Sequence, residues 1–550
     1  MYPLFRKKFF ILRLSYLPAG RRTKCKTSKK RISFGKTAFL DTLSNLSEVS
    51  NTLCSLFPIL YPLFSMPLAR RIAYNVVFNS VAKIASTVLA LVAIGFITRY
   101  LGTEGFGNYA TVLAFFGLFA ALADFGLSPL LAREISRKDA PEQTIVGNIV
   151  ALRIVSSSLV LGLALIATPF LPYDRELRLG IIIAAVAFVF ASSSGILNGI
   201  FQKRLAMFEV ATVEFLGKCL QLGIIVAAVS FDWGFGAIIL ALLAYMVFNA
   251  VLLFFLSQRL LPFRLSFDIP FWKNFLRESL PVGIISIVSF AYFKMDTILL
   301  SILQGSADVG IYNAAYKIIE NLTFFPAMIA GLVLPLFSRY IFHEPEKFRL
   351  VADKTFKVFV VFAAPLAVGG FFLAEPLVLL IGGPDFLAAA LPLRILIFSL
   401  AAIFFGNFFN AILIAGNLQK RLLALLSVVA ACNIVANLLI IPRYSFAGAA
   451  GVSLATEGAV ALGTAILAFR FLGYRPDGHG VFRILLASVV LGAFLFFCAS
   501  FPFLVRLLGG IGVYLAALWA TGGISMDEVA PILFRKPASR KDMPISSPLI

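Results

Sequence analysis

The sequence predicts an all-α integral membrane protein with about 14 transmembrane helices. Hydrophobic residues make up 60% of the 550 residues, and the mean hydropathy is +0.94, well above the range of soluble domains. The apolar segments are each long enough to cross a hydrocarbon core about 30 Å thick, which needs roughly 20 residues per helix. Because backbone groups in lipid must be satisfied internally, we expect these segments to be helices.

The apolar segments alternate with short polar connections from about Val76 to about Thr521. This organisation is that of a polytopic membrane protein and favours a transporter. The expected spans are residues 76–98, 107–130, 144–170, 179–201, 208–230, 236–256, 281–303, 312–338, 358–381, 388–415, 422–441, 446–469, 484–504 and 507–523.

Lys and Arg residues predict the orientation, since cytoplasmic loops collect them. With the N-terminus inside, 23 of the 48 basic residues fall in cytoplasmic loops and the C-terminal tail, and 14 precede Val76. The outer loops hold five and the spans hold six. We therefore expect a multi-pass protein with both termini in the cytoplasm. The net charge of +21 follows from this topology, and the sequence offers no basic face of the kind that binds nucleic acid.

The first 70 residues are Arg-, Lys- and Ser-rich and are expected to form a basic, disordered segment. Three interpretations are open: an amphipathic targeting segment, a basic tail held to anionic lipid, or translation that begins at Met66. The run from Met66 to Arg71 directly precedes the first span as a normal cytoplasmic flank, which favours the third interpretation. The five cysteines form no CxxC pair and the two histidines have no neighbouring ligand, so we expect no catalytic residue, metal or cofactor.

Three loops between the first spans each recur six spans later in the chain. These repeats divide the first twelve spans into two sets of six. Spans 1–6 and 7–12 are therefore expected to form two lobes related by an axis along the membrane normal. The expected parts are an N-lobe over 71–260, a cytoplasmic linker over 261–280, a C-lobe over 281–475, two further spans over 476–525 and a cytoplasmic tail over 526–550. The matched loops are Gln202–Leu205 with Gln419–Leu422, Leu101–Ala110 with Leu303–Ala314, and Asp232–Ala237 with Arg443–Ala449.

The motifs at the start of each lobe resemble those of Wzx-type polysaccharide flippases. The first lobe carries them over Arg99–Ala110, Ala123–Ser128 and Arg133–Ile135, and the second over Asp296–Leu300, Val309–Lys317 and Leu334–Ser338. The likeness covers about residues 72–475. The resemblance implies a MATE-like superfamily that also contains lipid II flippases, with its lobes in a V-shaped arrangement. It also implies transport of oligosaccharide linked to a lipid.

Charged residues inside the spans are the candidate functional groups, because each costs about 2.5 to 3.5 kcal/mol at mid-membrane and tends to face a cavity or a partner. At 1.5 Å per residue, Arg153, Lys218 and Lys294 lie roughly 14 to 20 Å into their spans. Cations that line a wet cavity would offset the lost hydration of a diphosphate. The candidate cargo-binding cations are Arg153, Lys218, Lys294 and Lys317. Lys83 and Arg394 lie nearer their helix ends, where they can reach headgroups.

Buried acids are candidates for coupling transport to an ion, and they also offer the buried cations partners other than the cargo. Asp296, Glu320 and Glu457 are candidates for coupling to a proton or sodium ion. Lys317 and Glu320 are three apart and share a helix face, so they can neutralise each other. Lys294 and Asp296 are two apart and must find different partners. Interhelical pairing of the cations with Glu214 or the other three acids is the structural alternative.

The predicted function is that of a flippase for polyprenyl-diphosphate-linked oligosaccharide in the bacterial cytoplasmic membrane, working by alternating access. Membrane lipids, and glycan polymerases or glycosyltransferases, are the partners that this function implies. A MATE-like exporter of cationic compounds and a lipid II flippase are the alternatives within transport. A membrane polysaccharide polymerase or ligase is the alternative among enzymes, and the short outer loops, the longest of which runs from about Leu171 to Arg178, argue against it.

Overall fold

The fold is described from a computed structural model. It describes residues 68–124, 126–135, 141–204, 206–478 and 480–523. The chain divides into two compact units, Met1–Arg71 and Ile72–Ile550, and the helices discussed below belong to the second unit from Ile72 onward. The expected start at Met66 and the expected tail over 526–550 lie outside the described residues.

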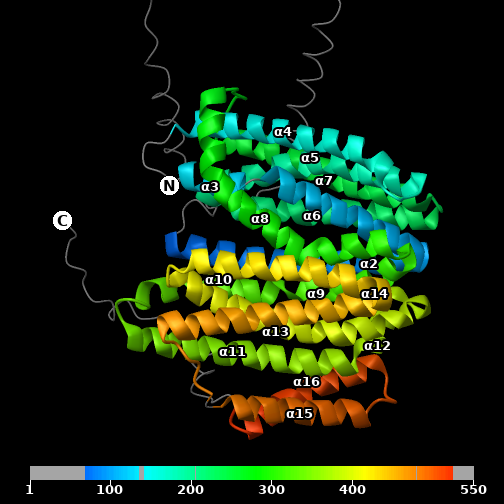
Figure 1. The fold of residues 1–550 in the computed structure, drawn as a ribbon, viewed down its shortest axis with the longest axis vertical. Coiled ribbons are helices and arrows are strands. Elements are labelled where there is room, and N and C mark those ends of the chain that lie inside the picture. The colour runs from blue at the N-terminus through cyan, green and yellow to red at the C-terminus, as the bar shows by residue number, and fades with distance from the viewer. Residues whose placement is uncertain (1–67, 125, 136–140, 205, 479, 524–550) are drawn as a thin grey trace, which may run out of the picture. The chain divides into compact units, whose positions relative to one another are not determined.

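All regular structure in the described part of the chain is helical (Figure 1). Ten helices there are long and apolar enough to cross a membrane, and Val481–Phe497 forms a shorter apolar helix. These findings confirm the predicted multi-pass helical membrane protein. In chain order the elements are α2 Leu68–Asp124, α3 Leu127–Ile135, α4 Glu142–Ala167, η2 Thr168–Phe170, α5 Arg175–Lys203, α6 Met207–Ser230, α7 Gly234–Leu260, α8 Ile269–Leu303, α9 Ser306–Leu322, α10 Phe324–Tyr340, α11 Pro345–Phe372, α12 Ala374–Gly382, η3 Pro384–Ala389, α13 Ala390–Ala415, α14 Gln419–Leu472, α15 Val481–Phe497 and α16 Phe503–Ala520.

Two of the helices, α2 and α14, each contain two of the predicted spans. α2 is interrupted at Gly102, whose φ of +65° is a conformation that glycine adopts without steric cost. α14 is interrupted at Ser445, with φ of +45°. Both interruptions fall where the sequence predicts a loop between spans. With these two divisions, and with α8 and α15 included, the described helices account for the 14 predicted apolar segments.

The boundary between the last two predicted spans is displaced. The sequence predicts spans over 484–504 and 507–523, whereas α15 ends at Phe497 and α16 begins at Phe503. Pro502 stands immediately before α16, a place where its missing N–H costs no hydrogen bond. Hydropathy does not mark this turn, because it contains the apolar Phe501 and is flanked by the apolar Phe497 and Phe503.

The helices up to α7 form one packed group. α5 contacts α4 and α7, and α6 packs against α7. At the end of this group nearest α3, a hydrophobic cluster with Leu131 and Phe201 at its centre also includes Phe263 and Phe275. The cluster therefore extends from the first lobe into the connection and the start of α8.

α8 joins the two halves. It begins at Ile269, where the Asp268 carboxylate accepts a hydrogen bond from the backbone N–H of Phe271. Residues 261–280, expected as a linker, are therefore already helical from Ile269 onward. The start of α8 is held to α4, because the indole N–H of Trp272 donates to the carbonyl of Asn148 at 3.1 Å. The other end of α8 packs against α14 and α9.

α13 lies at the centre of the second half, where it contacts α9, α10, α11, α12 and α14. It is apolar on nearly all its faces, as expected for a helix surrounded by others, and Phe404 and Phe408 on it are fully buried. α15 and α16 pack against each other, and α15 packs against α11. Figure 1 shows them beyond α11, away from the helices that carry the buried charges.

Candidate functional site

A cavity of about 440 Å³ lies between helices of the two halves, and we call it the central cavity. The first half contributes α2, α6 and α7, and the second half contributes α9 and the first residue of α10. Its polar and aromatic lining residues include Lys83, Ser86, Thr87, Tyr109, Phe116, Glu214, Lys218, Gln221, Tyr245, Lys317, Glu320, Asn321 and Phe324. Segments more than 200 residues apart in the sequence thus share one wall.

Three lysines and two glutamates line the central cavity, so its formal charge is one unit positive. Lys83 contacts Glu214 at 3.2 Å. Lys218 donates to the side-chain oxygen of Gln221 at 3.1 Å, and its ammonium lies 4.2 Å from the centre of the Tyr245 ring. Neither of those two partners of Lys218 carries a charge. Lys218 therefore keeps its positive charge available to an anion in the cavity.

Lys218 is deep in its helix. It lies eleven residues after Met207, the first residue of α6, or about 17 Å along the axis at 1.5 Å per residue. An aromatic face and an amide oxygen are the neighbours that stabilise a cation without cancelling its charge. This local environment explains how a lysine can remain at such depth in an apolar helix bundle.

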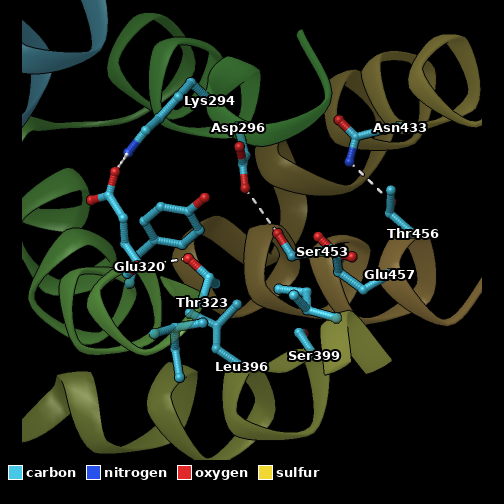
Figure 2. A pocket seen from close by; sticks show the side chains of 13 residues that line it. Lys294, Asp296, Glu320, Thr323, Leu396, Ser399, Asn433, Ser453, Thr456 and Glu457 are labelled. Carbon is cyan, nitrogen blue, oxygen red and sulfur yellow. Dashed lines mark hydrogen bonds and ion pairs between the residues drawn. The ribbon is translucent and has the colours of Figure 1, made fainter. Parts of the chain in front are cut away.

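A second cavity, of about 240 Å³, lies within the second half, and we call it the C-lobe cavity. Helices α8, α9, α13 and α14 form it, with Thr323 at the junction of α9 and α10. Figure 2 shows the side chains that line it: Lys294, Asp296, Tyr316, Ile319, Glu320, Thr323, Leu396, Ser399, Ile403, Asn433, Ser453, Thr456 and Glu457. Its formal charge is two units negative, because three carboxylates face one lysine.

Asp296 is the most buried carboxylate of the C-lobe cavity, with 3% of its surface exposed. Its Oδ2 atom accepts hydrogen bonds from the hydroxyls of Tyr312 and of Ser453, the latter at 2.8 Å. Among the residues that the structure describes, its buried Oδ1 atom has no hydrogen-bond partner, and neither has the buried hydroxyl of Ser399 across the cavity. A buried carboxylate oxygen without a donor is costly, and a cation or a proton would satisfy it.

Glu320 lines both cavities. Its Oε1 atom contacts the ammonium of Lys294 at 2.6 Å, and its Oε2 atom contacts the ammonium of Lys317 at 2.6 Å. Figure 2 shows Lys294 reaching from α8 to Glu320 on α9. The predicted pair of Lys317 and Glu320 is therefore confirmed, and Lys294 joins it as a third member.

Arg153 lies apart from the other predicted cations. It is 5% exposed and lines neither of the two cavities described. Its Nη1 atom donates to the carbonyl of Ala123 at 2.8 Å and contacts a carboxylate oxygen of Asp124 at 3.0 Å. The structure thus gives Arg153 an interhelical acidic partner, although not one of the four acids that the sequence suggested. Asp124 is the last residue of α2.

Of the predicted site residues, the structure brings together Lys218 and Lys317 at the central cavity, and Lys294, Asp296 and Glu457 at the C-lobe cavity. Arg394 pairs with Glu375 at 2.7 Å outside the lining of both. The sequence did not identify the uncharged polar lining. The signal that could have found it is the set of hydroxyl and amide side chains inside spans, which includes Gln221, Ser399, Asn433, Ser453 and Thr456.

The two halves also touch at the ends of the helices nearest Gly102. The Thr98 hydroxyl donates to the carbonyl of Ile381 at 2.9 Å, and the Arg99 guanidinium donates to that of Leu380 at 2.8 Å. The rings of Phe106 and Phe386 meet edge to face, with centres 5.8 Å apart.

Residues 72–341 match a family described as polysaccharide biosynthesis protein. A curated relative, the probable low-salt glycan biosynthesis flippase Agl15 of Haloferax volcanii, is 23% identical over 382 residues. The aligned part covers 67% of this chain and 78% of that protein.

Solved structures with the same fold include the lipid II flippase MurJ in an inward closed conformation, with a TM-score of 0.65 and 17% identity over 84% of this chain and 99% of that chain. They also include an inward-facing multidrug resistance MATE family transporter of the MOP superfamily, with a TM-score of 0.55 and 15% identity over 72% of this chain and 98% of that chain. At these identities the likeness concerns the fold. The family match and the shared fold agree with the resemblance to Wzx-type flippases that the sequence motifs indicate.

Proposed function

We propose that this protein is a flippase that moves polyprenyl-diphosphate-linked oligosaccharide across the membrane. The observation that carries the proposal is the placement of Lys218 and Lys317, which come from opposite halves and line one central cavity. An anionic group bound between them would contact both halves at once. The names of the family and of the curated relative support glycan biosynthesis as the setting.

The charge of the cargo explains the need for such a cavity. A diphosphate loses its hydration when it enters an apolar bundle, and charged hydrogen bonds from lysine ammonium groups replace part of that hydration. Lys294 contributes indirectly through Glu320, since it faces the C-lobe cavity. We assign no cargo contact to Arg153, because its guanidinium is engaged by Asp124 outside the central cavity.

Movement of the cargo would follow alternating access between the two halves. The contacts of Thr98 with Ile381 and of Arg99 with Leu380 close one end of the interface. Transport requires these contacts to break while the opposite end closes. The neutral bond from Thr98 is worth roughly 0.5–1.5 kcal/mol and the bond from the charged Arg99 guanidinium roughly 1.5–3 kcal/mol. Both are side-chain bonds to backbone carbonyls, so they can separate without disrupting either half.

The C-lobe cavity is the proposed site of ion coupling. Asp296, with its unpartnered Oδ1 atom, and Glu457 would hold a monovalent cation or a proton. The Ser399 hydroxyl, for which the described residues supply no partner, lines the same cavity and offers a neutral oxygen of the kind that hard cations take as a ligand. A gradient of that ion would then drive the change between the two arrangements of the halves.

The alternatives predict different cavities. A MATE-like exporter of cationic drugs would present a negative central cavity, whereas this one is formally positive. A polymerase or ligase would need a larger outer platform for its acids, and the connection that follows η2 consists of Leu171–Asp174. A lipid II flippase carries a lipid with the same diphosphate, so the glycan attached to the lipid is what distinguishes that alternative from the proposed function.

We place the protein in the bacterial cytoplasmic membrane with cytoplasmic termini, where glycosyltransferases would supply the cargo and a polymerase would consume it.

Reconstitution tests the proposal. The purified chain is placed in liposomes, and the transbilayer movement of a fluorescent undecaprenyl-diphosphate oligosaccharide is measured beside the uptake of an organic-cation dye. Movement of the lipid without uptake of the dye supports the flippase. Uptake of the dye without movement of the lipid assigns the protein to drug export.

A further inference from the structure

We propose that Glu320 couples the two cavities, so that cargo binding in the central cavity and cation binding in the C-lobe cavity strengthen each other. The inference rests on the proposed function. It adds the residue through which the anionic cargo and the coupling ion affect one another.

The position of Glu320 is the first observation. Among the residues that line the two cavities described, Glu320 is the one that lines both. Each of its carboxylate oxygens contacts a different lysine at 2.6 Å, Oε1 with Lys294 and Oε2 with Lys317. Lys294 belongs to the lining of the C-lobe cavity and Lys317 to that of the central cavity. The three side chains therefore form a continuous bridge from one cavity to the other.

The charge of this bridge is the second observation. One carboxylate faces two ammonium groups, so the group of three carries one excess positive charge. All three side chains are mostly buried, with 17% to 34% of each exposed. In such surroundings charges are only weakly screened, and the two lysines compete for the same carboxylate. A change at one lysine must therefore alter the strength of the other contact.

An anion in the central cavity changes the Lys317 contact. Phosphate oxygens near Lys317 replace Glu320 Oε2 as its partner, because a diphosphate offers more negative charge than one carboxylate. Glu320 is then left with Lys294 as its lysine partner, and that ion pair strengthens. Lys294 is drawn toward Glu320 and away from Asp296, the carboxylate two residues along α8 that faces the same cavity.

A cation in the C-lobe cavity has the same effect from the other side. Bound at Asp296, it repels the ammonium of Lys294 and so favours the contact of Lys294 with Glu320. Glu320 then holds Lys317 less tightly, and Lys317 is released to the cargo. Both ligands favour one arrangement, with Lys317 on the cargo and Lys294 on Glu320, so the coupling is positive. By linkage, each ligand raises the affinity of the other by the same factor.

The experiment measures the affinity of the purified full-length chain for undecaprenyl diphosphate, in sodium chloride and in choline chloride, each at an acidic and an alkaline pH. For the wild type we expect sodium or acid to tighten binding, by a factor within the roughly 5- to 150-fold that is typical of coupled sites. For Glu320→Gln we expect one affinity under all conditions. Glu214→Gln is the matched control, because it removes a lysine-paired carboxylate from the central cavity alone. Its affinity should still respond to the cation.

The possible results separate this inference from the proposed function. A cation response that persists in Glu320→Gln overturns the coupling role, and so does a wild type that binds undecaprenyl diphosphate with no cation response. In both cases binding itself still supports the flippase. A wild type that does not bind the lipid contradicts the proposed function and the inference with it. If Glu320→Gln does not fold, Lys294→Gln with Glu320→Gln conserves the net charge and leaves both cargo lysines in place, and the same loss of cation response is expected.

Discussion

Gly107 and Gly310 lie in backbone contact where the second part of α2 crosses α9. A Cβ atom on Gly107 would lie 1.7 Å from the carbonyl oxygen of Ser306, and one on Gly310 would lie 2.0 Å from that of Thr103. The two glycines occupy matched places in the repeated loops that the sequence identifies, each two residues before a tyrosine. Equivalent elements of the two halves thus close one end of the interface on each other.

Gly107→Ala and Gly310→Ala are therefore expected to destabilise this arrangement of the halves. Overpacking costs typically about 1–3 kcal/mol, here against backbone atoms that cannot rotate away. In each of these two variants, a cysteine introduced at Ser86, on the central cavity, should be labelled from the outer side by an impermeant thiol reagent. We expect this labelling to be faster than in the protein that keeps both glycines. Gly305→Ala is the control, because a Cβ there has nothing within 4 Å. Labelling that is equal in all three variants would contradict closure by the glycine pair.

Loss of either lysine of the central cavity should weaken cargo binding. A hydrogen bond to a charged group contributes about 1.5–3 kcal/mol, so Lys218→Gln and Lys317→Gln should each bind undecaprenyl diphosphate roughly tenfold or more weakly. Titration of the purified variants with the lipid measures the effect. Arg394→Gln removes a cation that pairs with Glu375 outside the lining of both cavities, and its affinity should equal that of the wild type. Unchanged binding in both lysine variants would remove their cargo role.

Arg153 is expected to act on stability. Removing one partner of a buried ion pair costs about 3–5 kcal/mol, so Arg153→Ala should lower the Tm measured in detergent and the yield of folded protein. Replacing both partners, as Arg153→Met with Asp124→Leu, should recover much of that loss, because no charge is left buried. An Arg153→Ala variant with a wild-type Tm that no longer binds the lipid would instead show that Arg153 contacts cargo.

Asp296 is expected to set the response to the ion gradient. Asp296→Asn keeps the size of the side chain and removes its charge, so a cation or proton no longer gains from binding there. The rate of lipid translocation in proteoliposomes should become the same with and without an imposed sodium or proton gradient. Asp308→Asn is the control, since that carboxylate accepts from the Ser445 hydroxyl at 2.7 Å and lines neither of the described cavities. A gradient response that survives in Asp296→Asn would place the coupling ion elsewhere.

The sequence predicts the elements of this fold well, because bilayer thickness and backbone hydrogen bonding impose simple rules on apolar segments. Helical geometry also predicts local side-chain relations. Lys317 and Glu320, three residues apart, do pair, and Lys294 and Asp296, two apart, do have different partners. Such relations depend only on the 3.6-residue period, which needs no knowledge of how helices are arranged.

Contacts between side chains on different helices could not be predicted in this way. Asp124 reads as a polar cap at a helix break, and nothing in its local sequence indicates that Arg153 on α4 reaches it. The polar lining of the C-lobe cavity was missed for the same reason. Ser399 and Thr456 lie in apolar helices, where a hydroxyl can bond to its own backbone, as Thr456 does to Val452. Only the arrangement of α8, α13 and α14 brings them beside Asp296.

The central claim is that Lys218 and Lys317 hold the diphosphate of a lipid-linked glycan during its passage across the membrane. The most direct test compares the transbilayer movement of undecaprenyl-diphosphate oligosaccharide with that of a matched neutral lipid-linked oligosaccharide lacking phosphate, in proteoliposomes of the wild type and of Lys218→Gln with Lys317→Gln. The account predicts fast movement of the diphosphate lipid by the wild type alone, and no movement of the neutral lipid. Equal movement of both lipids by the wild type, or full activity of the double variant, would contradict it.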